Sequence, residues 1–174
     1  MKFGACKRPG LRTHRRGHFS NPRSGMHLFA EPLRPPDLHI TGLRLWVHGR
    51  QFPMADDYWD GNWLQVTVHC AASGARVWVT GPILHVPEIA HFLRGIEALH
   101  ASLQGEATLP CMEPELAVTL TAEGLGHITM VVAITPDHLA QDHRFTFRLD
   151  QSYLPAMMDS CRTILRQYPV KGQP

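Results

Sequence analysis

The chain has 174 residues, of which 44% are hydrophobic and 18% are charged. This length and composition predict a globular protein of about one domain, large enough to bury a core of its own. No run of about 18 apolar residues occurs, so we expect no membrane partner.

The four cysteines lie far apart and form no paired CxxC spacing. A disulfide framework or a structural zinc site would show closer pairs, so we expect neither. The first residues lack the apolar stretch of a secretory signal. Together these features favour a reducing, cytoplasmic location.

Charge divides the chain unevenly. Residues 1–35 carry eight basic side chains and one acidic one, a net charge of +7, whereas residues 36–174 carry nine and fourteen, a net charge of −5. The first segment is rich in Arg, Gly, Pro, His and Ser and has no regular period, which is typical of disorder. We therefore predict a basic, disordered leader over 1–36 and a single domain over 37–171. The leader could also be an arm that binds nucleic acid, or an over-long gene start with Met26 as the true first residue.

Alternation of apolar and polar residues predicts strands along the rest of the chain. Residues 38–48 alternate with a one-residue slip at Thr41-Gly42, which we interpret as a β-bulge. Further strands are expected near 64–70, 75–79, 116–120, 128–134 and 145–149, with turns at Ser73-Gly74 and Glu123-Gly124.

Two segments have helical periodicity. The first begins near Pro87 and ends at Gln104-Gly105, and the second begins after Asp150 or Ser152 and stops before Pro169. The order of elements predicts an α+β fold, an antiparallel sheet of about six strands with two helices packed on one face.

The densest group of chemically distinctive residues is the segment from Asp56 to Trp63, which holds three carboxylates and three aromatic rings. An EF-hand loop is excluded because Tyr58 or Trp59 would occupy the third ligand position. A divalent ion held by Asp56, Asp57 and Asp60 is an alternative. Otherwise the segment is either a structural loop, with Trp59 as a core anchor, or a recognition surface, and the two do not exclude each other.

Three tryptophans, Trp46, Trp63 and Trp78, fall on the opposite phase from the apolar residues of their strands. They predict an aromatic patch on the far face of the sheet, either exposed for docking or covered by another segment; we favour the covered form. The histidines show no metal-ligand spacing, and most are expected at the surface. Serine-nucleophile and phosphate-loop motifs are missing as well. We therefore expect no enzyme, no catalytic residue, no metal and no cofactor.

The string Asp57-Tyr58-Trp59-Asp60-Gly61-Asn62-Trp63-Leu64, followed by a strand, resembles the signature of the WapI-type bacterial immunity proteins. Later segments are similar to that family too: Glu113-Pro114-Glu115-Leu116, Asp150-Gln151-Ser152-Tyr153-Leu154 and Tyr168-Pro169-Val170. The resemblance covers about Leu38 to Val170 and leaves the leader without a counterpart.

The resemblance implies a small cytoplasmic protein that binds and neutralises a cognate polymorphic toxin, often a nuclease domain. An acidic body suits a basic nuclease, although the charge of the leader opposes this. We expect the partner surface to include Asp56, Asp57, Tyr58, Trp59, Asp60 and Trp63. The alternative function is a small-ligand or metal-binding module that uses the same loop.

Overall fold

The computed structural model describes residue 32 and residues 34–174, so almost all of the predicted leader lies outside the described residues. In chain order the elements are β1 (Leu38–Ile40), β2 (Leu43–Arg50), η1 (Asp60–Asn62), β3 (Trp63–Ala72), β4 (Ala75–His85), α1 (Val86–Ser102), β5 (Glu106–Pro110), β6 (Leu116–Gly124), β7 (His127–Ile134), β8 (Arg144–Asp150), η2 (Gln151–Tyr153) and α2 (Leu154–Gln167).

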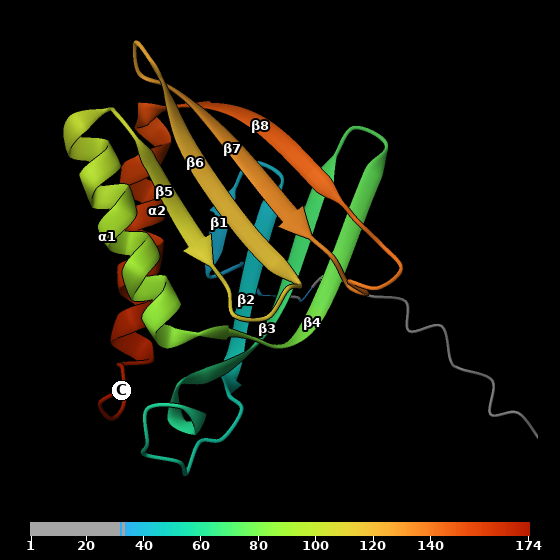
Figure 1. Cartoon of the computed structure of the whole chain (residues 1–174), viewed down its shortest axis with the longest axis vertical. Coiled ribbons are helices and arrows are strands. Elements are labelled where there is room, and N and C mark those ends of the chain that lie inside the picture. Colours follow the sequence, from blue (N-terminus) through green and yellow to red (C-terminus); the bar gives the residue numbers. More distant parts are fainter. Residues whose placement is uncertain (1–31, 33) are drawn as a thin grey trace, which may run out of the picture.

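These strands form two antiparallel sheets of four strands each, with the orders β1-β2-β3-β4 and β5-β6-β7-β8 (Figure 1). The predicted α+β class is confirmed, but the single sheet of about six strands is wrong. Alternation shows that each strand has one wet face, and it carries no information on which strands share a sheet. The division falls at α1, which separates the last strand of one sheet from the first strand of the other.

The slip at Thr41-Gly42 is a turn rather than the predicted bulge. Ile40 pairs with Leu43 and Leu38 with Leu45, so β1 and β2 form a hairpin with a two-residue connection. Thr41 adopts a positive φ of 48° there. Opposite residues of a hairpin point to the same face, so a two-residue turn shifts the apolar phase by one residue, as a bulge does.

The other predicted turns hold with one shift. The Ser73-Gly74 turn between β3 and β4 is confirmed. The later hairpin turns at Leu125-Gly126, two residues beyond the predicted position, because β6 runs on to Gly124. Strand β5 was not predicted, since its five residues are too few to show a period and they end in Pro110.

Both helices occupy their predicted segments. His85 and Glu88 form a capping box at the start of α1, and Leu103 in the left-handed region ends it, ahead of the predicted Gln104-Gly105 stop. Asp150 caps the short turn η2 by accepting a hydrogen bond of 2.8 Å from Ser152 N, and η2 continues directly into α2.

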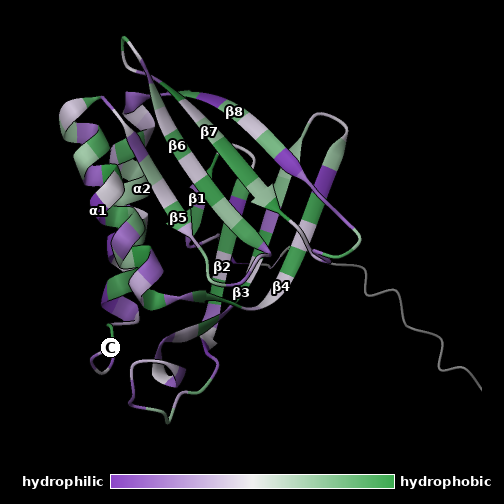
Figure 2. Ribbon diagram, viewed as in Figure 1, coloured by the Kyte–Doolittle hydropathy of each residue, from purple (hydrophilic) through white to green (hydrophobic). Residues whose placement is uncertain are grey.

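The inward apolar faces of both sheets and the buried stripes of both helices form one continuous core, visible as green stripes along β6 and β7 in Figure 2. The helices do not cover a sheet face as predicted. They lie side by side along one side of the two sheets, where α1 packs along β5 and α2 contacts β1. Within the described part of the chain, no helix is long and apolar enough to cross a membrane.

The predicted tryptophan patch is only partly formed. Trp46 and Trp78 stack with ring centroids 6.0 Å apart, and His69 stacks on Trp78 at 3.8 Å. Trp46 is only 1% exposed, and its Nε1 donates to Arg34 O at 2.9 Å, so the segment before β1 crosses over it. Trp63 stands apart, against His85 at 5.1 Å.

Candidate functional site

The acidic loop, residues 51–62, connects β2 to β3 and lies beside the tail, residues 168–172, which follows α2. Figure 1 shows the loop at the lower end of the molecule, close to the C-terminus. The two segments are more than 100 residues apart in sequence, so their contact is a product of the fold.

Asn62 holds the two segments together. Its side chain is fully buried, at 0% exposure. Nδ2 donates to Tyr58 O at 2.7 Å and to Lys171 O at 2.8 Å, and Oδ1 accepts from Lys171 N at 2.9 Å. One amide thus fixes both the loop backbone and the tail backbone.

Two cations complete this connection. Lys171 Nζ donates to Ala55 O at 2.7 Å and to Pro53 O at 3.1 Å, and it pairs with the Asp56 carboxylate at 3.1 Å. Arg50 donates to Gly61 O and to Pro169 O. We call the contacts of Arg50, Asn62 and Lys171 the loop–tail clasp. Because the clasp satisfies backbone carbonyls on both segments, it gives the loop a defined shape.

Asp57 shapes the tip of the loop from within. Its Oδ1 accepts from Trp59 N and from Asp60 N, both at 2.8 Å, an arrangement that starts the short turn η1. Asp60 lies in the first turn of η1 and is exposed. The three predicted carboxylates therefore have three different surroundings and do not share one ion site.

An aromatic group stands behind the loop tip. Tyr58 packs edge-on against Trp59 at 5.2 Å and against His85 at 5.5 Å, and Trp59 stacks on His85 at 6.2 Å. His85 is 2% exposed, and its Nε2 lies 3.1 Å from both Tyr58 O and Trp59 O. Both oxygens are acceptors, so Nε2 carries the proton. Trp59 is 58% exposed, which shows that the interpretation as a core anchor is wrong.

A groove of about 350 Å³ opens beside this group. Its walls come from the loop tip, the first turns of α1 and the end of β5 with the residues after it. The lining residues are Tyr58, Trp59, His85, Pro87, Glu88, His91, Arg94, Pro110 and Met112. Aromatic and apolar surface thus meets one buried carboxylate and two basic side chains on α1, the composition of a site that seats a side chain of a partner.

Glu88 ties the walls of the groove together. Oε2 accepts from His85 N at 2.8 Å and Oε1 accepts from Met112 N at 2.7 Å. Burial raises the pKa of Glu88, since desolvation disfavours the charged carboxylate, while the two backbone N–H groups act in the opposite direction.

This pKa shift predicts a pH dependence of stability. The unfolded chain releases the Glu88 proton near the ordinary value of 4.5, whereas the folded chain holds it to a higher pH. As pH rises from below 4.5 through the raised value, the unfolded state is therefore favoured by Glu88. We expect the wild type to lose stability relative to Glu88→Gln over that window, as measured by urea denaturation at a series of pH values. A difference that is constant with pH, or that changes in the opposite direction, would contradict the assignment.

Five of the predicted site residues lie on the loop and the sixth, Trp63, begins β3 and joins the same aromatic group. Sequence reasoning missed Asn62, His85, Glu88 and Lys171 as parts of the site. Asn62 and Glu88 carried a signal, since one lies inside the motif string and the other follows Pro87 at a helix start. Among the described residues, no three His, Cys, Asp or Glu side chains are grouped to hold a metal ion.

The profile of the immunity protein WapI-like family matches residues 37–169. The chain belongs to this family. A search of the curated proteins found no match.

In this member of the WapI-like family, two of the four segments that suggested the family meet around the clasp. The Asp57–Leu64 string supplies Asn62 and the loop tip, and the Tyr168–Val170 segment supplies the tail that Arg50 and Lys171 hold. Arg50 also lies over the Tyr168 ring, 6.0 Å from its centroid. Two of these segments therefore shape one surface.

Proposed function

We propose that this chain is an immunity protein that binds a toxin protein directly and neutralises it without chemistry of its own. Family membership supports the class of function. The main support for a partner surface at the acidic loop is the exposed side chain of Trp59. Its large ring is held in a fixed position by a buried network. A partner that covers this ring gains apolar contact area at little cost in conformational entropy.

The proposed partner surface consists of Asp56, Asp57, Tyr58, Trp59, Asp60 and Trp63 together with the groove beside them. Trp59 supplies one wall of the groove and Met112, which is 50% exposed, lies on its lining as well. The clasp and Asp57 fix the loop before binding, so little ordering free energy opposes association. This rigid apolar centre with charges around it is the usual composition of a binding hot spot.

The negative net charge of the domain supports a basic toxin, such as a nuclease domain, as its partner. Residues 36–174 carry a net charge of −5, and the loop contributes three exposed carboxylates. One of them, Asp56, is already paired with Lys171, so Asp60 on η1 is the better candidate for attracting a cation of the partner. The active cleft of a nuclease attracts phosphate, so a surface of carboxylates on this chain would speed its association with the toxin.

We also propose that residues 37–171 act as one domain and that the protein works in the cytoplasm, where a toxin would otherwise act.

The test begins with a tagged pull-down, washed at low and then high salt, to identify a toxin by mass spectrometry. The recovered toxin domain is then expressed with variants of this chain, and protection and Kd are measured. We expect Trp59→Ala to raise Kd by about 30-fold, the loss typical of a central aromatic anchor. Asp60→Lys is expected to slow association and to weaken its dependence on salt.

Controls separate the surface from the fold. Leu125→Ala removes a side chain that is 100% exposed at the β6–β7 turn, on another part of the molecule, and should leave Kd unchanged. Asp57→Asn keeps the oxygen that accepts from Trp59 N and Asp60 N, whereas a lysine there would unfold the loop tip. If folded Trp59→Ala and Asp60→Lys bind and protect as the wild type does, the loop is not the interface. Protection without a complex would refute direct binding.

A further inference from the structure

The four sheet edges of the molecule differ in how they are protected. Helices α2 and α1 contact the edge strands β1 and β5. The edge strand β4 contains Pro82, which has no N–H to offer, and its register shifts near Gly81. Strand β8 has neither protection: it runs from Arg144 to Asp150 without proline or a register shift. An edge of this kind is open to pairing with another strand.

The backbone of β8 shows which groups are available. Ile134 N donates to His143 O and Gln151 N donates to Gly126 O, and both pairs lie in the register that joins β7 to β8. Hydrogen-bonded and non-hydrogen-bonded pairs alternate along an antiparallel ladder. The odd-numbered residues of β8 therefore bond to β7, and the N–H and C=O groups of Arg144, Thr146 and Arg148 point away from it. All three residues are exposed.

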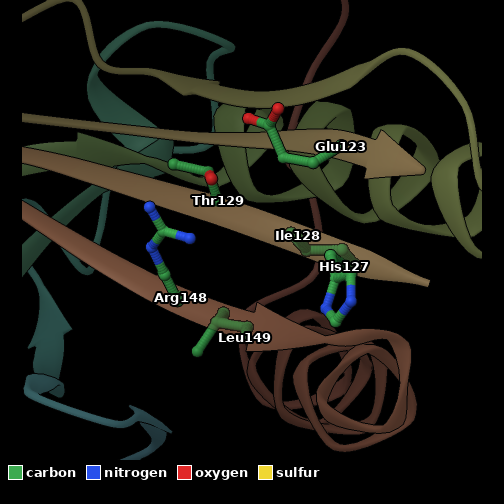
Figure 3. A pocket seen from close by; sticks show the side chains of 6 residues that line it. All are labelled: Glu123, His127, Ile128, Thr129, Arg148 and Leu149. Carbon is green, nitrogen blue, oxygen red and sulfur yellow. The ribbon is translucent and has the colours of Figure 1, made fainter. Parts of the chain in front are cut away.

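The outer face of the sheet beside this edge carries short side chains on β7 and β6. These side chains are Thr129, Val131 and Ala133 on β7, and Ala117, Thr119 and Thr121 on β6. At one end lies a hollow of about 320 Å³, lined by Glu123, His127, Ile128, Thr129, Arg148 and Leu149 (Figure 3). In Figure 3, Arg148 lies beside Thr129, while Glu123 comes from β6, two strands away from the edge.

The positive charges on β8 indicate which kind of partner would bind there. Arg144 and Arg148 project from the same face, four residues apart, and within the described part of the chain neither forms an ion pair. Cross-strand pairs of opposite charge stabilise a sheet and like charges oppose it. We propose that β8 binds an extended segment of a partner protein as a fifth strand of the β5–β8 sheet, with carboxylates at two positions four residues apart that face Arg144 and Arg148.

A second copy of the chain fits this edge less well. In the register that pairs the whole of β8 with itself, Arg144 faces Asp150 of the other copy. Arg148 then faces Thr146 and gains no opposite charge. A foreign acidic strand satisfies both arginines. This interface is separate from the acidic loop and holds even if the loop binds nothing.

The test uses the ¹⁵N-labelled full chain and a blocked peptide, Ser-Glu-Val-Thr-Val-Glu-Ser, with a control peptide in which both Glu are Lys. We expect the acidic peptide to shift the amide resonances of Arg144, Thr146 and Arg148 and to slow their hydrogen exchange. Its affinity should exceed that of the lysine peptide by about tenfold, from two attractive pairs in place of two repulsive ones.

Two variants at Thr146 isolate the backbone contribution. Thr146→Pro removes an N–H that β7 does not use, so the fold should survive and peptide binding should be lost. Thr146→Val keeps the N–H and should keep binding, and so should Trp59→Ala. The proposal is overturned if millimolar peptide shifts nothing at β8, if both peptides bind equally, or if Thr146→Pro binds as Thr146→Val does. A β8-dependent dimer of the chain alone in the ultracentrifuge would overturn it as well.

Discussion

Replacement of Asn62 by alanine is expected to lower the free energy of unfolding by about 3 kcal/mol, because it leaves buried backbone groups of two segments without partners. The wild-type amide makes three hydrogen bonds of 2.7–2.9 Å in a site with 0% exposure. Alanine offers no replacement, and water reaches the site only if the loop moves away from the tail. Urea denaturation measures the loss, and hydrogen exchange over residues 51–61 and 168–172 reports whether the two segments separate.

Two further variants show whether the effect belongs to the buried amide. Gln104→Ala truncates an exposed amide after α1 and should change stability by less than about 0.5 kcal/mol. Lys171→Met keeps the backbone that bonds to Asn62 and removes only the ammonium contacts with Pro53, Ala55 and Asp56. It should cost less than Asn62→Ala. Equal stability of Asn62→Ala and Gln104→Ala would show that the clasp does not hold the loop.

Gly42→Ala is expected to destabilise the protein by about 3 kcal/mol or more, from overpacking where the two sheets meet. A Cβ atom at this position would lie 2.0 Å from Ala71 O and 2.8 Å from the Phe147 ring. Ala71 O belongs to the backbone of β3, which cannot rotate aside, and Phe147 lies on β8 in the other sheet. The extra methyl group must therefore push the β1–β2 turn away from both. Thermal unfolding should show a Tm lower by about 10 °C.

Gly81→Ala is the matched control for this substitution. Its added Cβ would meet only Ile83 Cγ2, at the ordinary contact distance of 3.4 Å. Gly81 lies in β4 of the sheet to which the β1–β2 turn belongs. It should change stability by less than about 1 kcal/mol. A Gly42→Ala protein as stable as Gly81→Ala, with the β1–β2 pairing intact, would contradict the close approach.

Local pattern was sufficient to predict most elements of the fold. Alternation located β3, β4 and the β6–β8 strands, and a 3.6-residue stripe with Pro87 and Asp150 at the starts located both helices, because each signal lies within one element. The local pattern could not predict that the strands divide into two sheets, because strand pairing depends on contacts between distant segments. At Thr41-Gly42 two different structures give the same phase slip, so the sequence alone could not distinguish a turn from a bulge.

The candidate site divides in the same way. A cluster of acidic and aromatic residues drew attention to the loop, where Trp59 is exposed. The residues that shape the loop were missed because their partners are distant: Asn62 meets Lys171 across 109 positions, and His85 meets Tyr58 across 27. The local sequence around a buried asparagine in a turn is the same as that around an exposed one. Only its surroundings reveal the difference.

The position of Lys171 has a practical consequence for anyone who trims or tags this protein. The family match ends at residue 169. A fragment cut to those limits would keep every strand and helix of the described residues but would lose Lys171, which holds the acidic loop. Such a fragment would pass circular dichroism and size tests while its acidic loop adopts an altered shape. A fusion partner joined directly after Lys171 would crowd the acidic loop. Position 172 has no space for a side chain, because a Cβ there would lie 2.5 Å from Tyr58 N. Affinity handles belong at the other end of the chain.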